Sequence, residues 1–180
     1  EAAMQFAAAD LKNNKEFIIK NVKNNHPIVR FISKELKNDV AFVVSLVKTN
    51  GLTLEYVFRE HKDYYYIVLY AIEENGSALK FASDNLRNNQ NIVRKAILSS
   101  DEAFVYASDE LKTNVDFLSS IFGLKPHLIN KIPKKMFEKR DFVIRALICY
   151  PNLFLMNQEV LEVLRKDQGI ILDVIDENTS

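Results

Sequence analysis

The reactive side chains of this sequence are few, and their spacing limits the chemistry that they could do. A nucleophilic site would need Cys149, the single cysteine, beside a base such as His127. The 25-residue period described below places these two residues in turns one repeat apart. Stacked helices lie about 8–10 Å from one another, whereas a nucleophile and its base need about 2.6–3.2 Å. The sequence therefore does not predict a Cys–His enzyme.

Metal and phosphate sites are disfavoured in the same way. His26, His61 and His127 belong to different repeats, and neither HExxH, CxxC nor EF-hand spacing is present. The four glycines are scattered singly, so they do not form the glycine-rich turn that cradles a phosphate. We expect no catalytic residue, no metal and no cofactor in this chain.

Two tyrosines give the most specific indication of binding. Tyr66 and Tyr70 are four residues apart, so they project from one face of a helix. The equivalent positions of other repeats hold solvent-type or small residues, which predicts an exposed face. Tyrosine is favoured at interface hot spots because it buries a large area at low rotamer cost. We predict a protein-binding surface made by Tyr66, Tyr70, Ser45 and Lys95; the alternative is that the tyrosines cover neighbouring apolar surface.

A basic cluster distinguishes the sixth repeat. Between Lys125 and Arg145 the only acids are Glu138 and Asp141. The residues predicted to meet an anionic membrane or headgroup are Lys131, Lys134, Lys135, Lys139 and Arg140. Each basic residue near such a surface contributes about 1 kcal/mol. The alternative is pairing with the carboxylates of the acidic last repeat, which are Glu159, Glu162, Asp167, Asp173, Asp176 and Glu177.

Overall composition favours a folded protein without a nucleic-acid role. The chain has 24 basic and 24 acidic residues, and both halves are close to neutral, so we expect no nucleic-acid partner. The lone cysteine fits a reducing compartment, and no apolar run is long enough to cross a membrane, so we expect a soluble protein. Because Glu1 already lies inside the repeat pattern, we expect the chain to be a fragment of a longer protein.

A period of 25 residues positions all of these side chains. One position recurs as an almost wholly apolar series, Leu11, Leu36, His61, Leu86, Leu111, Met136 and Leu161. A fixed period of this length is typical of a solenoid, in which each unit buries its apolar face against its neighbours. We predict an all-α fold: an α-solenoid of about seven short helix-turn-helix repeats, forming one domain over residues 1–180.

Each repeat is predicted to contain two helices of about 10 residues. In the second repeat, the first helix begins at Pro27 and carries Leu36, and the second helix buries Phe42, Val43, Leu46 and Val47. Residues suited to cap the second helix recur as Asn13, Asn38, Asp63, Asn88 and Thr113. The second helix is predicted to end at Asn50-Gly51 or Asn75-Gly76 with a left-handed cap.

Three repeats depart from this plan. His61 replaces the series leucine and is predicted to be an interior histidine that is hydrogen-bonded to a neighbouring helix end. Pro133 is predicted to break the first helix of the sixth repeat after Ile132. In the last repeat the pattern is displaced, because Leu164 rather than Leu161 begins the phrase that matches the one at Leu36. We therefore expect three inserted residues there and a terminal cap.

The segment from Ala78 to Asn89, with the helix that follows it, resembles a bacterial repeat family catalogued as a domain of unknown function. That family occurs in tandem arrays and is frequent in secreted effectors of intracellular bacterial pathogens. The resemblance implies helical hairpins and, for an effector, delivery into the host cytoplasm. It implies no activity and brings no catalytic residue.

The preferred prediction is therefore a non-enzymatic protein–protein interaction scaffold, part of a secreted effector, that binds a partner on the exposed face of the second helices. One alternative is a module that docks on anionic membrane through the basic sixth repeat. Another is an accessory segment of an enzyme whose catalytic part lies outside this chain.

Overall fold

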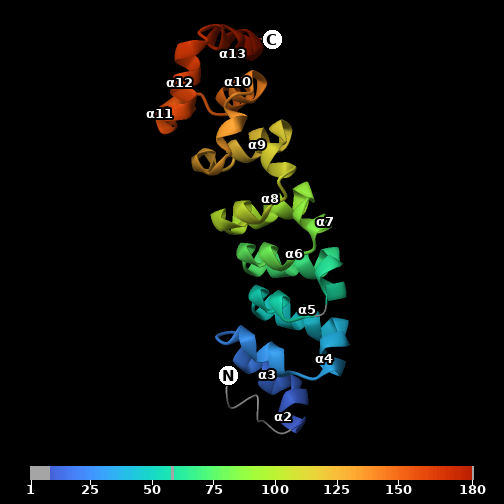
Figure 1. The fold of residues 1–180 in the computed structure, drawn as a ribbon. Coiled ribbons are helices and arrows are strands. Elements are labelled where there is room, and N and C mark those ends of the chain that lie inside the picture. Colours follow the sequence, from blue (N-terminus) through green and yellow to red (C-terminus); the bar gives the residue numbers. More distant parts are fainter. Residues whose placement is uncertain (1–8, 58, 180) are drawn as a thin grey trace. The chain divides into compact units, whose positions relative to one another are not determined.

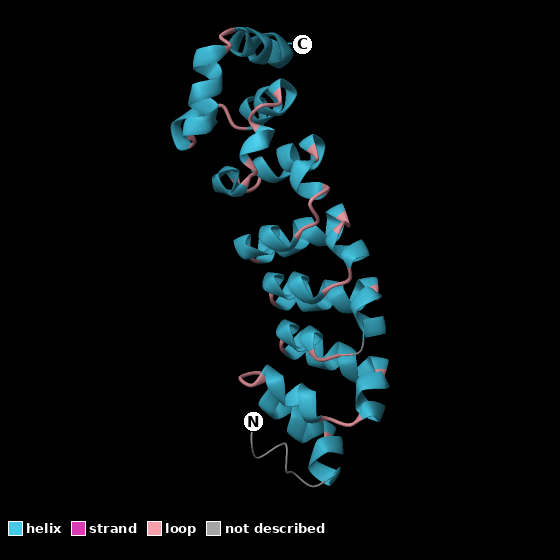
Figure 2. Cartoon of the chain, in the orientation of Figure 1, coloured by secondary structure: helices cyan, strands magenta, loops and turns pink. Residues whose placement is uncertain are grey.

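The structure, a computed structural model, describes residues 9–57 and 59–179 (Figure 1). All regular elements among these residues are helical, and they contain no strand (Figure 2). The predicted all-α class is confirmed. The chain divides into two compact units, Glu1–Ala107 and Ser108–Ser180. The expectation of one domain stays a prediction.

The first unit repeats a three-element order of 3-10 helix, short helix and longer α-helix. Its elements are α2 (Ala9–Asn13), α3 (Lys15–Val22), η1 (His26–Phe31), α4 (Lys34–Asn38), α5 (Val40–Thr49), η2 (Gly51–Glu55), η3 (Arg59–Asp63), α6 (Tyr65–Glu74), η4 (Gly76–Phe81), α7 (Asp84–Arg87), α8 (Gln90–Ser99) and η5 (Asp101–Tyr106), where η marks a 3-10 helix. The longer helices contact one another in chain order, α3 to α5 to α6 to α8. In the same order η1 contacts η2, η2 contacts η4, and η4 contacts η5.

The second unit continues the pattern with η6 (Leu111–Thr113), α9 (Val115–Phe122), η7 (Pro126–Lys131), η8 (Lys134–Met136), α10 (Arg140–Cys149), α11 (Leu153–Met156), α12 (Gln158–Lys166) and α13 (Gly169–Thr179). Helix α10 contacts both α9 and α13. The last repeat differs as expected, because α12 has nine residues where α4 has five.

The first helix of a repeat is not one helix, and this part of the prediction was wrong. In the second repeat η1 ends at Phe31, the following Ile32 is extended with a ψ of 160°, and α4 begins after Ser33. The Ser33 hydroxyl accepts a hydrogen bond from the amide of Leu36, so it caps the second piece. Ser83 does the same for Leu86. The break predicted at Pro133 is present, but it lies at the position where the second and fourth repeats also bend, at Ser33 and Ser83.

The caps of the second helices lie one residue later than predicted. Asn14, Asp39, Asn89 and Asn114 accept from the first-turn amides, whereas the predicted Asn13 and Asn38 lie at the ends of the preceding short helices. The following residue is the one with extended backbone, and this conformation suits an N-cap.

The cap Asp39 also joins two repeats. Lys15 donates to its Oδ2 at 2.5 Å while Oδ1 accepts from the Phe42 amide at 3.1 Å. These hydrogen bonds, that of Lys15 first, lower the pKa of Asp39 below its ordinary value of 3.8. A depressed folded-state pKa stabilises the fold above the unfolded pKa, and that stabilisation is lost as the pH falls through the folded pKa.

Replacing Asp39 with asparagine is therefore expected to lower stability slightly at pH 7 and to have no effect once Asp39 is protonated, well below pH 3.8. Asparagine keeps the capping oxygen, as Asn14 and Asn89 show at equivalent positions, so only the charge is lost. Urea unfolding at several pH values measures the difference. In the Lys15→Met background the substitution should have little effect at any pH; an equal loss at pH 7 and pH 2 would contradict the assignment.

The predicted left-handed caps at Asn50-Gly51 and Asn75-Gly76 were wrong. The described residues contain no positive φ, and Asn50 is extended with φ −155°. Its side chain instead caps the next 3-10 helix by accepting from the Leu52 amide. Gly51 is required for space, because a Cβ there would lie 2.1 Å from the Ala71 carbonyl oxygen.

The core forms between successive repeats. In the first unit Ile18 and Val22 of α3 pack in one cluster with Phe42 and Leu46 of α5 and with the apolar residues of η1 and α4. The predicted core positions of the second helix, Phe42, Val43, Leu46 and Val47, are all buried. Helices this short are marginal alone, so this shared burial holds each repeat in place.

Candidate functional site

Among the side chains that the structure describes, the most exposed aromatic group lies at the start of α6. Tyr66 is 70% exposed, and Tyr64 and Tyr65 are also exposed. The rings of Tyr65 and Tyr66 meet edge to face with centroids 5.5 Å apart, and Tyr64 meets His61 in the same way at 5.6 Å. Three consecutive tyrosines thus present a partly pre-ordered aromatic surface, which we call the tyrosine surface (Tyr64–Tyr66).

The tyrosine surface replaces a helix cap. Helix α6 begins after Tyr64, which makes no side-chain cap hydrogen bond, whereas Asn14, Asp39, Asn89 and Asn114 cap the equivalent helices. Loss of such a cap typically costs about 1 kcal/mol. Large apolar side chains in water and an uncapped helix both oppose stability. Helix α10, whose N-cap is Lys139, likewise has no side-chain cap, so the exposed rings rather than the missing cap distinguish the start of α6.

Tyr70 has a different environment from Tyr66. It is half-buried, and the Lys48 ammonium lies over its ring, 3.9 Å from the centroid. A cation at that distance is attracted by the negative face of the ring. Because Lys48 lies on α5 and Tyr70 on α6, this contact links two successive repeats. The alternative role of covering neighbouring surface therefore describes Tyr70 better than Tyr66.

Ser45 and Lys95, the other two residues of the predicted binding surface, lie on the helices next to α6. Ser45 of α5 is exposed and donates its hydroxyl to the Ala41 carbonyl at 3.0 Å. Lys95 of α8 pairs with Glu73 of α6 at 3.6 Å, with both side chains half-exposed. The four predicted residues thus lie on three consecutive, contacting helices.

The sequence interpretation missed a recurring contact between successive second helices. Lys48 and Tyr70, like Glu73 and Lys95, occupy the same two positions of adjacent repeats, so the separation along the chain is the same in both pairs. In the second unit Arg145, at the position of Lys95, pairs instead with Asp116 of α9, which has the repeat position of Tyr66. For Glu73 and Lys95 the available signal was a pair of opposite charges on successive second helices.

His61 is the interior histidine predicted from the repeat. It is 5% exposed, and its Nε2 lies 2.8 Å from the Lys37 carbonyl oxygen at the end of α4. Since a carbonyl only accepts, Nε2 donates the proton. The equivalent carbonyls of Lys12 and Lys62 accept from the Ser33 and Ser83 amides. The hydrogen-bonding prediction for His61 is confirmed.

The basic cluster of the sixth repeat is exposed, but two of its members have acidic partners. Lys134 pairs with Glu159 at 3.0 Å, and its hydrogen bond is the main cause of the lowered pKa of Glu159. Arg140 pairs with Asp167 at 3.0 Å and also with Asp173. Lys131, Lys135 and Lys139 are exposed as well. These pairs favour the alternative of neutralisation by the last repeat.

Other chemical sites receive little support from the described part of the chain. Residues 9–57 and 59–179 contain no group of three His, Cys, Asp or Glu side chains that could hold a metal. Cys149 is exposed and lines a groove with Ser119, Arg145, Ile148 and Glu177. Within the described residues no helix has the length and apolar character needed to span a membrane.

The fold and the site together define an all-helical protein made of short repeats, whose exposed aromatic residues interrupt the repeat pattern. The chain belongs to the family described as domain of unknown function DUF4116, whose model matches residues 14–62 and 65–112, more than half of the chain. Each match spans two repeats, so the family unit is a pair of the repeats described above. No match was found among the curated proteins or the solved structures.

Proposed function

We propose that this chain is a non-enzymatic α-solenoid scaffold that recognises another protein through the tyrosine surface. The observation that carries the proposal is the first turn of α6, where a capping residue is replaced and Tyr66 is 70% exposed. Aromatic residues of this kind dominate the energy of protein interfaces. The exposed polar residues Ser45 and Lys95 would supply hydrogen bonds at the rim of the contact.

The solenoid part of the proposal rests on the order of contacts. In the first unit the longer helices and the 3-10 helices each contact their successors along the chain. The 25-residue period continues into the second unit, where α10 contacts α9 and α13. Repeats that contact only their neighbours along the chain build an extended surface that can bind a partner. The resemblance to effector repeats makes a host cytoplasmic protein the proposed partner.

Replacing Tyr66 with alanine is expected to weaken partner binding by about tenfold or more, which is the effect of losing a hot-spot tyrosine. The partner is first captured in host lysate with a photo-crosslinking residue in place of the exposed Ser45, which leaves the tyrosine surface intact, and is identified by mass spectrometry. Titration of the purified partner against the wild-type chain and Tyr66→Ala then gives the two dissociation constants.

The matched control is Val105→Ala, which removes a similarly exposed apolar side chain from η5. It should bind like the wild-type chain, and both variants should keep the wild-type circular dichroism spectrum and melting temperature. Equal affinity of Tyr66→Ala and the wild-type chain would refute the tyrosine surface as the binding site. A large loss of helicity in Tyr66→Ala would show instead that the residue belongs to the core.

A further inference from the structure

Cations lie over aromatic rings at several places in the first unit. The guanidinium of Arg30 lies 5.3 Å from the ring centroid of Tyr56, and the ammonium of Lys48 lies 3.9 Å from that of Tyr70. The negative face of each ring attracts the cation. Among the side chains that the structure describes, no lysine or arginine lies over the three rings of the tyrosine surface. A cation for these rings would have to come from a partner.

A polar hollow adjoins the tyrosine surface. Asp63, the residue before Tyr64, lines this hollow together with Ser83, Asp84 and Asn85, and its volume is about 250 Å³. Asp63 and Asp84 are both exposed. We call this feature the acidic hollow. Because Asp63 and Tyr64 are consecutive, a partner segment that covers the rings can also reach the hollow.

The negative charge of the acidic hollow is only partly neutralised. Asp84 pairs with Arg87 at 2.6 Å, whereas Asp63 accepts a hydrogen bond from the uncharged Ser83 hydroxyl at 2.6 Å. The ammonium of Lys62 donates to a backbone carbonyl of its own repeat at 3.0 Å. Within the described part of the chain, Asp63 therefore has no cationic partner.

Comparison of the repeats shows that stacking does not require these two carboxylates. In the first five repeats the other residues at the position of Asp63 are uncharged: Asn13, Asn38, Asn88 and Thr113. Those at the position of Asp84 are Ala9, Lys34, Arg59 and Asp109. Within these repeats both positions are acidic only beside the three tyrosines, so the negative charge and the aromatic surface occur together.

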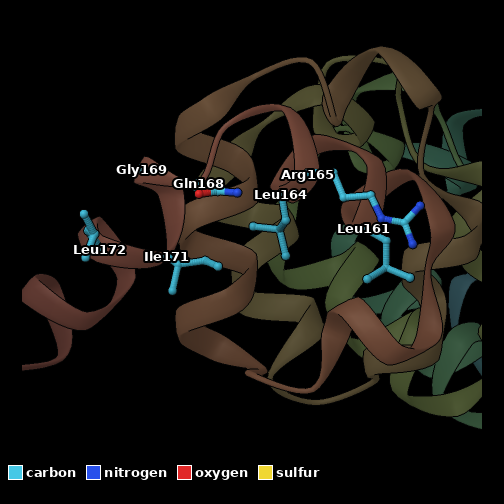
Figure 3. A pocket seen from close by; sticks show the side chains of 7 residues that line it. All are labelled: Leu161, Leu164, Arg165, Gln168, Gly169, Ile171 and Leu172. Atoms are coloured by element: carbon cyan, nitrogen blue, oxygen red, sulfur yellow. The ribbon is translucent and has the colours of Figure 1, made fainter.

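A larger groove, on α12 and α13 of the second unit, is mainly apolar (Figure 3). Leu161, Leu164 and Ile171 line it. An apolar surface alone does not specify the chemistry of what covers it. The tyrosine surface differs, because carboxylates beside exposed rings favour a positively charged partner.

We propose that the tyrosine surface and the acidic hollow together bind a basic segment of the partner protein. An arginine or lysine of that segment lies on the exposed rings, as Lys48 lies on Tyr70, and a second basic residue pairs with Asp63. Arginine suits both places, because its planar guanidinium stacks on aromatic rings and binds a carboxylate through two hydrogen bonds. This charge preference rests on the proposed function, because it concerns the same surface.

Selection of displayed peptides tests the preference before the partner is known. A phage library of random peptides is depleted on the Tyr66→Ala chain and then selected on the wild-type chain. Peptides that require Tyr66 are expected to contain more arginine and lysine than the unselected library. Tyr66-dependent peptides without this excess would overturn the charge preference and leave the proposed function standing. If no peptide depends on Tyr66, the basic segment is refuted, and the crosslinked partner alone decides the proposed function.

The selected peptide with the highest affinity is then the probe for Asp63. Asp63→Asn is expected to weaken its binding about fivefold at about 0.15 M salt and hardly at all at about 1 M salt, because salt screens exposed charges. Asparagine occupies this position as Asn38 and Asn88 and can still accept from Ser83, so the circular dichroism spectrum should be unchanged. A peptide whose basic residues are replaced by glutamine should bind the wild-type chain and Asp63→Asn equally.

The matched control is Glu102→Gln. It removes the same charge from another exposed carboxylate of the first unit that accepts from a serine hydroxyl, and it should bind the peptide like the wild-type chain. Equal weakening by Glu102→Gln and Asp63→Asn would indicate a general effect of net charge and overturn the proposal. Wild-type affinity of Asp63→Asn at the lower salt concentration would overturn it as well.

Discussion

Gly51→Ala is expected to destabilise the first unit by about 3 kcal/mol, the upper part of the usual range for overpacking. An added Cβ would lie 2.1 Å from the Ala71 carbonyl oxygen and 3.0 Å from its carbon. Both are backbone atoms, so a side-chain rotation cannot relieve the clash. The start of η2 would have to move away from the end of α6, and the buried contact between them would open.

Urea unfolding monitored by circular dichroism measures this effect. Gly76→Ala should behave like Gly51→Ala, because its Cβ would lie 2.2 Å from the Ala96 carbonyl oxygen. Gly123→Ala is the matched control: nothing lies within 4 Å of its Cβ, and its φ of −60° suits alanine. Alanine at such a site stabilises by about 0.4–1 kcal/mol. Similar losses for Gly51→Ala and Gly123→Ala would contradict the close-approach argument.

Phe142→Ala is expected to cost the second unit about 3–5 kcal/mol, the usual range for removing a buried aromatic ring. Phe142 of α10 is fully buried. Its ring meets those of Phe122 and Phe137 edge to face at 5.8 Å and 5.7 Å. Alanine would leave a cavity between these rings and remove two favourable aromatic contacts.

Differential scanning calorimetry of the same variant shows which part of the chain is affected. Phe142→Ala should lower the transition that contains the second unit. Gly51→Ala should act on the first unit and, if the two units melt separately, on the other transition. Phe142→Leu, which fills most of the cavity, should cost about 1.5 kcal/mol or less. A loss under about 1 kcal/mol for Phe142→Ala would show that the three rings do not form a packed core.

The period predicted the second helices and their core well, because burial between repeats depends on regular spacing alone. Phe42 and Leu46 could be assigned to the core from their positions in the repeat alone. The bend after η1 escaped the prediction because Ile28 to Leu36 keeps apolar spacing across it. Ser33 was the available signal, since a capping residue in the middle of a supposed helix indicates that a second helix begins there.

The misassigned glycines show a limit of local rules. Asn50-Gly51 has the composition of a left-handed helix end, and nothing nearby in the sequence argues against it. Glycine is needed at position 51 because its backbone lies close to the main chain at Ala71 in the next repeat, and the small side chain of Ala71 allows this approach. A Gly–Ala pair at these two positions recurs as Gly76 and Ala96, and that recurrence was the signal for packing.

The predicted binding residues lie together, but the sequence did not distinguish their roles. Tyr66 and Tyr70 lie on one face of the same helix, so their positions in the sequence give no reason to assign them different roles. Only the position of Lys48, on a different helix, separates a tyrosine that joins repeats from one that is exposed. Whether two side chains of adjacent repeats touch depends on their conformations, and the sequence does not specify these conformations.

The hydrogen bonds from the Ser33 and Ser83 amides to the Lys12 and Lys62 carbonyls have a consequence for how such a protein evolves. Both partners are main-chain groups, so nearly any substitution at these positions preserves the bond. Side chains on the surface can therefore diverge from repeat to repeat while the stacking register is retained. Proline is the exception, because it has no amide proton to donate. In the sixth repeat Pro133 occupies the position of Ser33 and Ser83, so it cannot donate this main-chain hydrogen bond.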